Sequence, residues 1–168
     1  KTEIIEHEFN NKRVVITGLG VISPVGTGKN KFWESLLKGV SGIDHITRFD
    51  TNGFSSKIAG EVKDFEPDKY IEKKEIKRLD RFTQFAVSAS KMAIEDAKLN
   101  LNDTDPNRAG VIVGSGIGGS ETWEQQHINL VKKGPRRVSP FFVPMIISNM
   151  ASGQVSMAFN LKGPNFTV

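Results

Sequence analysis

Residues 108–119 have the sequence RAGVIVGSGIGG, in which a run of β-branched residues ends in a cluster of glycines. The β-branched run predicts a buried strand. The glycines predict a turn whose backbone adopts φ > 0 or passes close to a neighbouring segment. A helix is expected directly afterwards, from about Glu121 to Lys132. A strand, a glycine turn and a helix in this order are typical of an α/β fold.

The same order occurs near the start of the chain. RVVITGLGVI (residues 13–22) predicts a second buried strand that ends in a glycine-rich turn. Asn30 is a candidate N-cap for a short helix over residues 31–38, and Gly39 is suited to close it. Three apolar side chains of this helix are expected to face inward: Phe32, Leu36 and Leu37.

Further elements extend the alternation. KIAGEV (57–62) predicts a short strand, and an amphipathic helix is expected from about Asp80 to Leu99. Pro144 suits the first turn of a helix that runs to about Asn160, and a last strand covers residues 165–168. The inward face of the Asp80 helix is expected to carry Phe82, Phe85, Ala86, Ala89, Ala93 and Ala97. Together these elements predict an α/β fold with a mixed, mostly parallel sheet and helices on both faces.

Composition narrows the class of protein. The 168 residues suffice for one domain, and 38% hydrophobic with 25% charged residues is typical of a globular chain. No apolar run approaches the roughly 20 residues of a membrane span. A net charge of +4 is too small to indicate nucleic acid as a partner. The sequence contains no cysteine, which excludes disulfides, thiolate metal sites and a thiol nucleophile among these residues.

The ends of the sequence are unlike its middle. Residues 1–12 are charged throughout and lack an apolar segment, so we expect a flexible tail and not a signal peptide. The last residues, NFTV, stop on a strand pattern just after a Gly163-Pro164 turn. We therefore expect residues 13–168 to be an incomplete domain.

Two glycine loops invite nucleotide-binding interpretations. GSGIGG (114–119) matches the dinucleotide pattern G-x-G-x-x-G, but the region about 20 residues later is KKGPRRVSP instead of an acidic strand end. SPVGTGKN (23–30) lacks two positions of a phosphate-binding loop. The glycines could equally allow close backbone packing, or GSGIGG could line a pocket for an extended apolar group. The pattern alone leaves these alternatives open.

Four blocks of sequence resemble one family. They are similar to the β-ketoacyl-acyl-carrier-protein (ACP) synthases, most of all to synthase II, the long-chain elongating member. The blocks are RVVITGLGVISPVG (13–26), GSGIGG (114–119), GPRRVSPFFVPMIISNMASG (134–153) and LKGPNFTV (161–168). The resemblance covers the chain from about Lys12 onward. It implies that this chain is the N-terminal half of a thiolase-like fold, which is completed by a second, similar half. The complete enzyme is expected to be a homodimer.

The resemblance also implies a reaction. A cysteine takes an acyl chain from acyl-ACP, and a decarboxylating Claisen condensation with malonyl-ACP gives 3-oxoacyl-ACP without a cofactor or metal. That cysteine is expected shortly after Val168, and two catalytic histidines belong to the missing C-terminal half. None of the three histidines present corresponds to them: His7, His45 and His127. The expected location is a bacterial cytoplasm or an organelle of bacterial origin.

Candidate site residues follow from the same resemblance. Ile117 corresponds to a residue that walls the acyl pocket, and Phe142 to one that reaches the partner subunit's pocket. Five basic residues correspond to positions that bind the acidic ACP: Lys74, Lys77, Arg78, Arg136 and Arg137. Without the resemblance, ordinary packing and a solvated charged face would explain these residues.

Two other functions remain as alternatives. A non-catalytic relative of the chain-length-factor type would have another residue in place of the cysteine and would act as a structural partner. A nucleotide-binding domain would bind NAD or ATP.

Overall fold

The computed structural model describes residues 13–168, so the tail expected over residues 1–12 lies outside the described part. The strands are β1 (Ile22–Ser23), β2 (Gly26–Thr27), β3 (Ile43–His45), β4 (Ile58–Gly60), β5 (Val111–Val113) and β6 (Asn165–Thr167). The α-helices are α1 (Lys29–Leu37), α2 (Lys73–Ile76), α3 (Arg81–Asp96), α4 (Ser120–Lys133), α5 (Phe142–Ile146) and α6 (Met150–Phe159). Four short 3₁₀ turns join them: η1 (Pro67–Lys69), η2 (Leu101–Asp103), η3 (Pro106–Arg108) and η4 (Pro135–Arg137).

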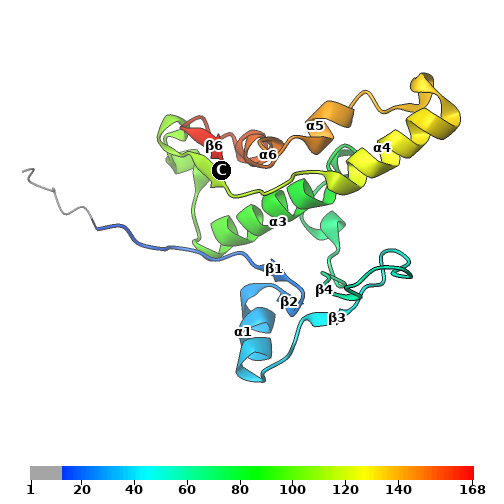
Figure 1. Cartoon of the computed structure of the whole chain (residues 1–168). Helices are drawn as coiled ribbons and strands as arrows, with labels where there is room; N and C mark the ends of the chain where they lie inside the picture. Colours follow the sequence, from blue (N-terminus) through cyan, green and yellow to red (C-terminus); the bar gives the residue numbers. More distant parts are fainter. Residues whose placement is uncertain (1–12) are drawn as a thin grey trace, which may run out of the picture.

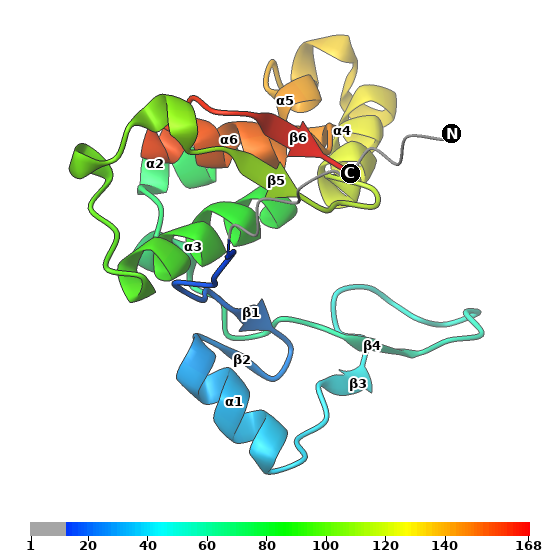
Figure 2. The ribbon, with the colours of Figure 1, turned by 90° about the vertical axis from the view of Figure 1, so that its left-hand side faces the viewer.

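The elements form tiers around α3. In Figures 1 and 2, α6 and the β5–β6 pair lie on one side of α3, and α1 with β1 to β4 lies on the other. The buried apolar cluster lies on the α6 side and contains Ile71, Leu79, Val87, Val111 and Val155. The core thus joins the segment before α3 to α3 itself, to α6 and to β5.

The sequence predicted a mixed, mostly parallel sheet, and one parallel pair of strands is present. β5 and β6 run parallel, with Val111 opposite Asn165 and Val113 opposite Thr167. The other two sheets of the described residues, β1–β2 and β3–β4, are antiparallel pairs. β4 confirms the short strand expected within residues 57–62. The molecule is therefore mixed α/β, with its parallel pair next to the core.

Helix α6 packs closely on the parallel pair because the residues at its start are small. Ala151 and Ser152 are fully buried. The Ser152 hydroxyl donates to the Asn165 side-chain oxygen at 2.8 Å and lies 2.9 Å from the Thr167 hydroxyl. The Asn165 amide in turn donates to the Ser152 carbonyl at 2.9 Å. These bonds satisfy polar groups that burial would otherwise penalise.

Helix α3 begins where the sequence predicted. The Asp80 carboxylate accepts a hydrogen bond from the Phe82 amide at 3.2 Å, which is an N-cap. The buried residues of α3 are Thr83, Val87 and Ser88, whereas the residues that were predicted to face inward are only partly buried. The buried face is therefore rotated relative to the predicted one, because the alanine-lined face contacts the N-terminal segment instead.

The buried strand predicted over residues 13–22 is wrong. Only Ile22 joins a ladder, and the side chains of Val14 and Ile16 are 95% and 83% exposed. The segment runs along α3, where a Cβ on Gly20 would lie 1.8 Å from the Ala89 carbonyl oxygen. The glycines of GLG are thus explained by close contact between backbones, and no strand in the described part pairs with residues 13–21.

Helix α1 differs from its prediction in two ways. It begins at Lys29 with Gly28 at the N-cap, so Asn30 lies inside the helix and does not cap it. Leu36 and Leu37 are exposed, the latter by 71%, so their predicted inward orientation is wrong; Phe32 is half-buried. The reason is that α1 packs mainly on the short strand β2, which covers only part of its surface.

The single helix predicted from Pro144 to Asn160 is two helices. The carbonyl of Ile146 accepts the Gly119 amide at 3.0 Å instead of continuing the helical ladder, and Ile147 is extended. Helix α5 therefore ends at Ile146 and α6 begins at Met150. No helix within residues 13–168 is long and apolar enough to cross a membrane.

Candidate functional site

The glycine loop between β5 and α4 lies against the end of α5. Gly118 has φ of 81°, and a Cβ there would lie 2.3 Å from the Ile146 carbonyl oxygen. A Cβ on Gly119 would lie 2.3 Å from the Met145 carbonyl oxygen. Gly116, in contrast, has open space around its Cα. Two glycines of GSGIGG are therefore needed for packing between loop and helix.

The N-terminus of α4 already has an anionic partner. The Asp80 carboxylate accepts from the Thr122 amide at 3.2 Å and from the Thr122 hydroxyl at 2.6 Å. A dinucleotide fold would place a pyrophosphate at this end of the helix. Because a buried side-chain carboxylate lies there instead, the geometry argues against the dinucleotide interpretation of GSGIGG.

Ile117 lies in the middle of this loop, between two glycines. Its side chain is 81% exposed in the described chain. Gly118 and Gly119, which follow it, let the backbone approach α5 while the isoleucine projects away from the buried core. Its predicted role as an acyl-pocket wall remains a prediction.

Phe142 packs within the chain at the start of α5. Its ring lies 5.8 Å from that of Trp123, in the first turn of α4, at an angle of 53°. Because Ile146 of the same short helix contacts Gly118 and Gly119, the structure brings Phe142 and the Ile117 loop onto adjoining segments. The predicted reach of Phe142 into a partner subunit remains a prediction.

The first basic group surrounds a single helical turn. Helix α2 covers only Lys73–Ile76, and Lys77 continues the helical backbone as its C-cap. Lys74 pairs with Glu72 at 2.8 Å, a hydrogen bond that raises the pKa of Lys74 and lowers the pKa of Glu72. Both side chains are largely exposed, so the pair is weak and can be exchanged for other partners.

Arg78 is held more firmly than the two lysines. Its guanidinium lies over the Phe141 ring, 5.0 Å from the ring centre, and 4.0 Å from a carboxylate oxygen of Glu75. A cation over an aromatic face is attracted by the ring quadrupole. The first basic group thus contacts Phe141, the residue before Phe142.

The second basic group lies at the other end of α4. Arg136 and Arg137 belong to η4, which follows the C-terminus of α4 directly (Figure 1). Arg137 lines a pocket of about 480 Å³ together with Asn129 and Lys133. Arg78 lies over Phe141, and the next residue, Phe142, packs on Trp123 in the first turn of α4, so the two basic groups lie toward opposite ends of this helix.

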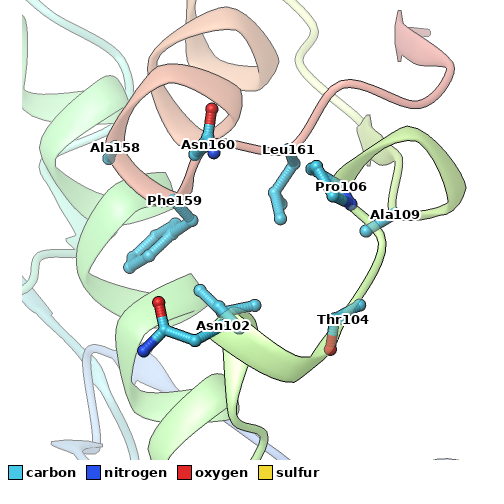
Figure 3. Close-up of a pocket in the computed structure, with 9 residues that line it drawn as sticks. Asn102, Thr104, Pro106, Ala109, Ala158, Phe159, Asn160 and Leu161 are labelled. Atoms are coloured by element: carbon cyan, nitrogen blue, oxygen red, sulfur yellow. The ribbon is translucent and has the colours of Figure 1, made fainter.

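Another pocket, of about 430 Å³, lies where α6 ends next to η2 and η3 (Figure 3). Phe159 and Leu161 point into it from the α6 side. It is lined by Leu101, Asn102, Thr104, Pro106, Ala109, Ala158, Phe159, Asn160 and Leu161. None of the site residues predicted from the sequence lines this pocket.

Residues 13–168 also contain no group of three acidic, histidine or cysteine side chains that could hold a metal ion.

The sequence analysis missed both roles of Asp80. The amphipathic run predicted a helix from about Asp80, but it did not identify Asp80 as the N-cap that the structure shows. Its bonds to Thr122, 42 positions away, left no signal in the sequence.

Comparisons with known proteins agree on one family. The family model described as beta-ketoacyl synthase, N-terminal domain, matches residues 11–168. A Staphylococcus aureus (strain N315) protein named 3-oxoacyl-[acyl-carrier-protein] synthase 2 is 57% identical over 155 residues, which are 92% of this chain and 37% of that protein. A Coxiella burnetii protein of the same name is 48% identical over 160 residues, 95% of this chain and 39% of that protein. The chain thus spans well under half the length of these relatives.

A solved structure shares the fold. The ishigamide ketosynthase/chain length factor superposes with a TM-score of 0.80 at 34% sequence identity, over 92% of this chain and 39% of that one.

Proposed function

The chain belongs to the β-ketoacyl synthase family, and from that membership we propose that it forms the N-terminal part of a 3-oxoacyl-ACP synthase II, a condensing enzyme of fatty acid elongation. The observation that carries the proposal is the 57% identity to a synthase 2 over 92% of this chain. The rest of the enzyme, including its nucleophile, would come from sequence beyond these residues.

The proposed reaction has two stages. A cysteine thiolate attacks the thioester carbonyl of acyl-ACP, and the carrier thiol leaves. The carbon–carboxylate bond of malonyl-ACP then breaks, CO₂ departs, and the electron pair remains on the α-carbon. That carbon attacks the acyl-cysteine carbonyl, forms the new carbon–carbon bond and expels the thiolate. Two histidines of the C-terminal half and backbone N–H groups would stabilise the developing negative charge.

The described residues would serve recognition instead of bond making. Ile117 would limit how far the acyl chain enters, and Phe142 would contribute to the pocket of the partner subunit in a homodimer. Exposure of Ile117 and its place beside α5 support this assignment.

The basic groups would bind the acidic carrier protein. The exposed charges of Lys74, Lys77 and Arg78 lie around one turn, and Arg136 with Arg137 lies one helix length away. Like-signed charges in two patches would steer an acidic partner and fix its orientation. The bacterial relatives support a cytoplasmic location, or an organelle of bacterial origin.

The test uses the full-length protein. Incubated with acyl-ACP and malonyl-ACP, it should release one CO₂ for each 3-oxoacyl-ACP formed. Replacement of the cysteine expected after β6 by alanine should abolish the formation of 3-oxoacyl-ACP. Absence of condensation by the intact wild-type protein with both carrier substrates would contradict the proposal.

A second candidate is a non-catalytic partner subunit, because the solved structure that shares the fold is titled a ketosynthase/chain length factor. Sequencing the peptide that follows β6 decides between them. A cysteine within the next few residues supports the synthase, and another residue at that position supports the partner subunit.

A further inference from the structure

Asp80 connects two helices through one carboxylate. Its Oδ1 accepts the Phe82 amide at 3.2 Å, at the start of α3. Its Oδ2 accepts the Thr122 amide at 3.2 Å and the Thr122 hydroxyl at 2.6 Å, at the start of α4. The side chain is buried, and both helix ends favour negative charge. The carboxylate therefore holds the two N-termini together.

The glycine loop is part of the same contact. Gly119, the last residue of the loop, is so close to Asp80 that a Cβ on it would lie 3.0 Å from Oδ2. The same Cβ would lie 2.3 Å from the Met145 carbonyl oxygen of α5. The end of the loop that carries Ile117 is thus enclosed between the Asp80 carboxylate and the α5 backbone.

The proposed docking residues lie immediately before this carboxylate. Lys77 and Arg78 precede Asp80 by three and two positions, and Arg78 also lies over the Phe141 ring. Phe142, the next residue, packs on Trp123 in the first turn of α4. The docking segment therefore contacts the pocket segments at two places, through Asp80 and through Arg78.

The hydrogen bonds of Asp80 are stronger than the ion pairs at the surface of the docking segment. Hydrogen bonds to a buried charge are strong, and removing a donor leaves that charge poorly satisfied. The pairs of Lys74 with Glu72 and of Arg78 with Glu75 are exposed and weak. An acidic partner that takes the place of Glu72 and Glu75 would therefore leave the hydrogen bonds of Asp80 intact.

We propose that Asp80 is a positioning residue that couples carrier docking at Lys77 and Arg78 to the geometry of the acyl-pocket loop. The proposal rests on the function proposed above. It makes docking and acyl-chain acceptance thermodynamically dependent on each other, with Thr122 as the contact on the α4 side.

A double-mutant cycle in the full-length synthase tests the coupling. The first change is Lys77→Glu with Arg78→Glu, and the second is Thr122→Val, which removes the hydroxyl donor at nearly constant volume. The measured quantity is kcat/KM for acyl-ACP. If the two sites act together, the combined loss should be smaller than the product of the separate losses by about fivefold or more.

Two controls separate coupling from simple damage. Thr122→Ser keeps the hydroxyl and should retain the wild-type response to the docking change. Arg136→Glu with Arg137→Glu alters the basic group at the far end of α4, so its loss should multiply independently with that of Thr122→Val. A merely structural role of Thr122 would lower the unfolding temperature but leave both cycles independent.

Amide hydrogen exchange gives a measurement that needs no variant. Saturating holo-ACP should slow exchange at residues 120–122 as well as at 73–78, and unchanged exchange at 120–122 would overturn the proposal. So would an independent outcome of the docking–Thr122 cycle in an active enzyme, which leaves the proposed function intact. A wild-type enzyme that fails to condense would overturn both.

Discussion

The glycine loop offers a matched pair of substitutions two residues apart. In Gly118→Ala the new methyl group would lie 2.3 Å from the Ile146 carbonyl oxygen and 3.1 Å from the Ser148 amide nitrogen, at a φ of 81°. Overpacking against backbone costs about 1–3 kcal/mol, and the left-handed conformation costs a residue with a Cβ about 1–2 kcal/mol more. We expect a loss of roughly 2–5 kcal/mol in the free energy of unfolding.

Gly116→Ala is the control in the same loop. A Cβ at Gly116 meets nothing within 4 Å, and its φ is not in the left-handed region. Replacing such a glycine restricts the unfolded chain, so the change should be neutral or stabilising by up to about 1 kcal/mol. Urea unfolding of both variants of the full-length protein measures the difference. Equal unfolding midpoints would refute the packing of Gly118 against Ile146 described here.

Three further outcomes test the charged and pocket residues in the full-length enzyme. Lys77→Glu with Arg78→Glu should raise KM for acyl-ACP about tenfold or more, because charge complementarity to the carrier is lost. The same variant should react almost normally with an acyl group on a small thiol. Equal losses with both donors would count against docking at these residues. Ile117→Phe should shorten the acyl chains accepted in a product-length assay, and an unchanged profile would remove Ile117 from the pocket. The hydrogen bond from Lys29 holds the pKa of Asp96 below its ordinary value, so this carboxylate contributes stability that is lost as pH falls below about 4. Asp96→Asn should therefore flatten the acid side of the stability–pH curve, and an unaltered acid limb would show that the pair contributes nothing.

Local signals in the sequence predicted the elements whose ends depend on neighbouring residues. Asp80 fixes the start of α3 by capping its own helix, and α4 covers the residues expected of it with one extra at each end. The strand after Gly163-Pro164 forms β6 and pairs in parallel with β5. In each case the information lies within a few residues of the boundary.

The wrong predictions depended on partners distant in sequence. Residues 13–22 have strand composition, but the segment lies along the alanine face of α3, so the backbone of residues 13–21 does not join a sheet in the described part. The break after Ile146 arises because Gly119 donates to its carbonyl, a contact between segments that are far apart in the chain. Local secondary-structure propensity cannot predict either contact, because each one joins segments that are distant in the sequence.

The candidate site shows the same division. The resemblance supplied Ile117, Phe142 and the basic residues, whose roles stay predictions until they are tested. The Asp80 link to Thr122 required coordinates, because its members lie in different sequence blocks and each has an ordinary local explanation.

The packing of α3 on α6 has a consequence for synthesis on the ribosome. Residues 81–96 leave the exit tunnel long before residues 150–159, and β5 likewise waits for β6. Until α6 emerges, Val87 and Val111 lack Val155, the member of their core cluster with the longest sequence separation. Such segments are vulnerable to aggregation while they wait. The growing polypeptide is therefore expected to engage a chaperone between the synthesis of α3 and that of α6, and ribosome profiling of chaperone-bound nascent chains would locate that interval.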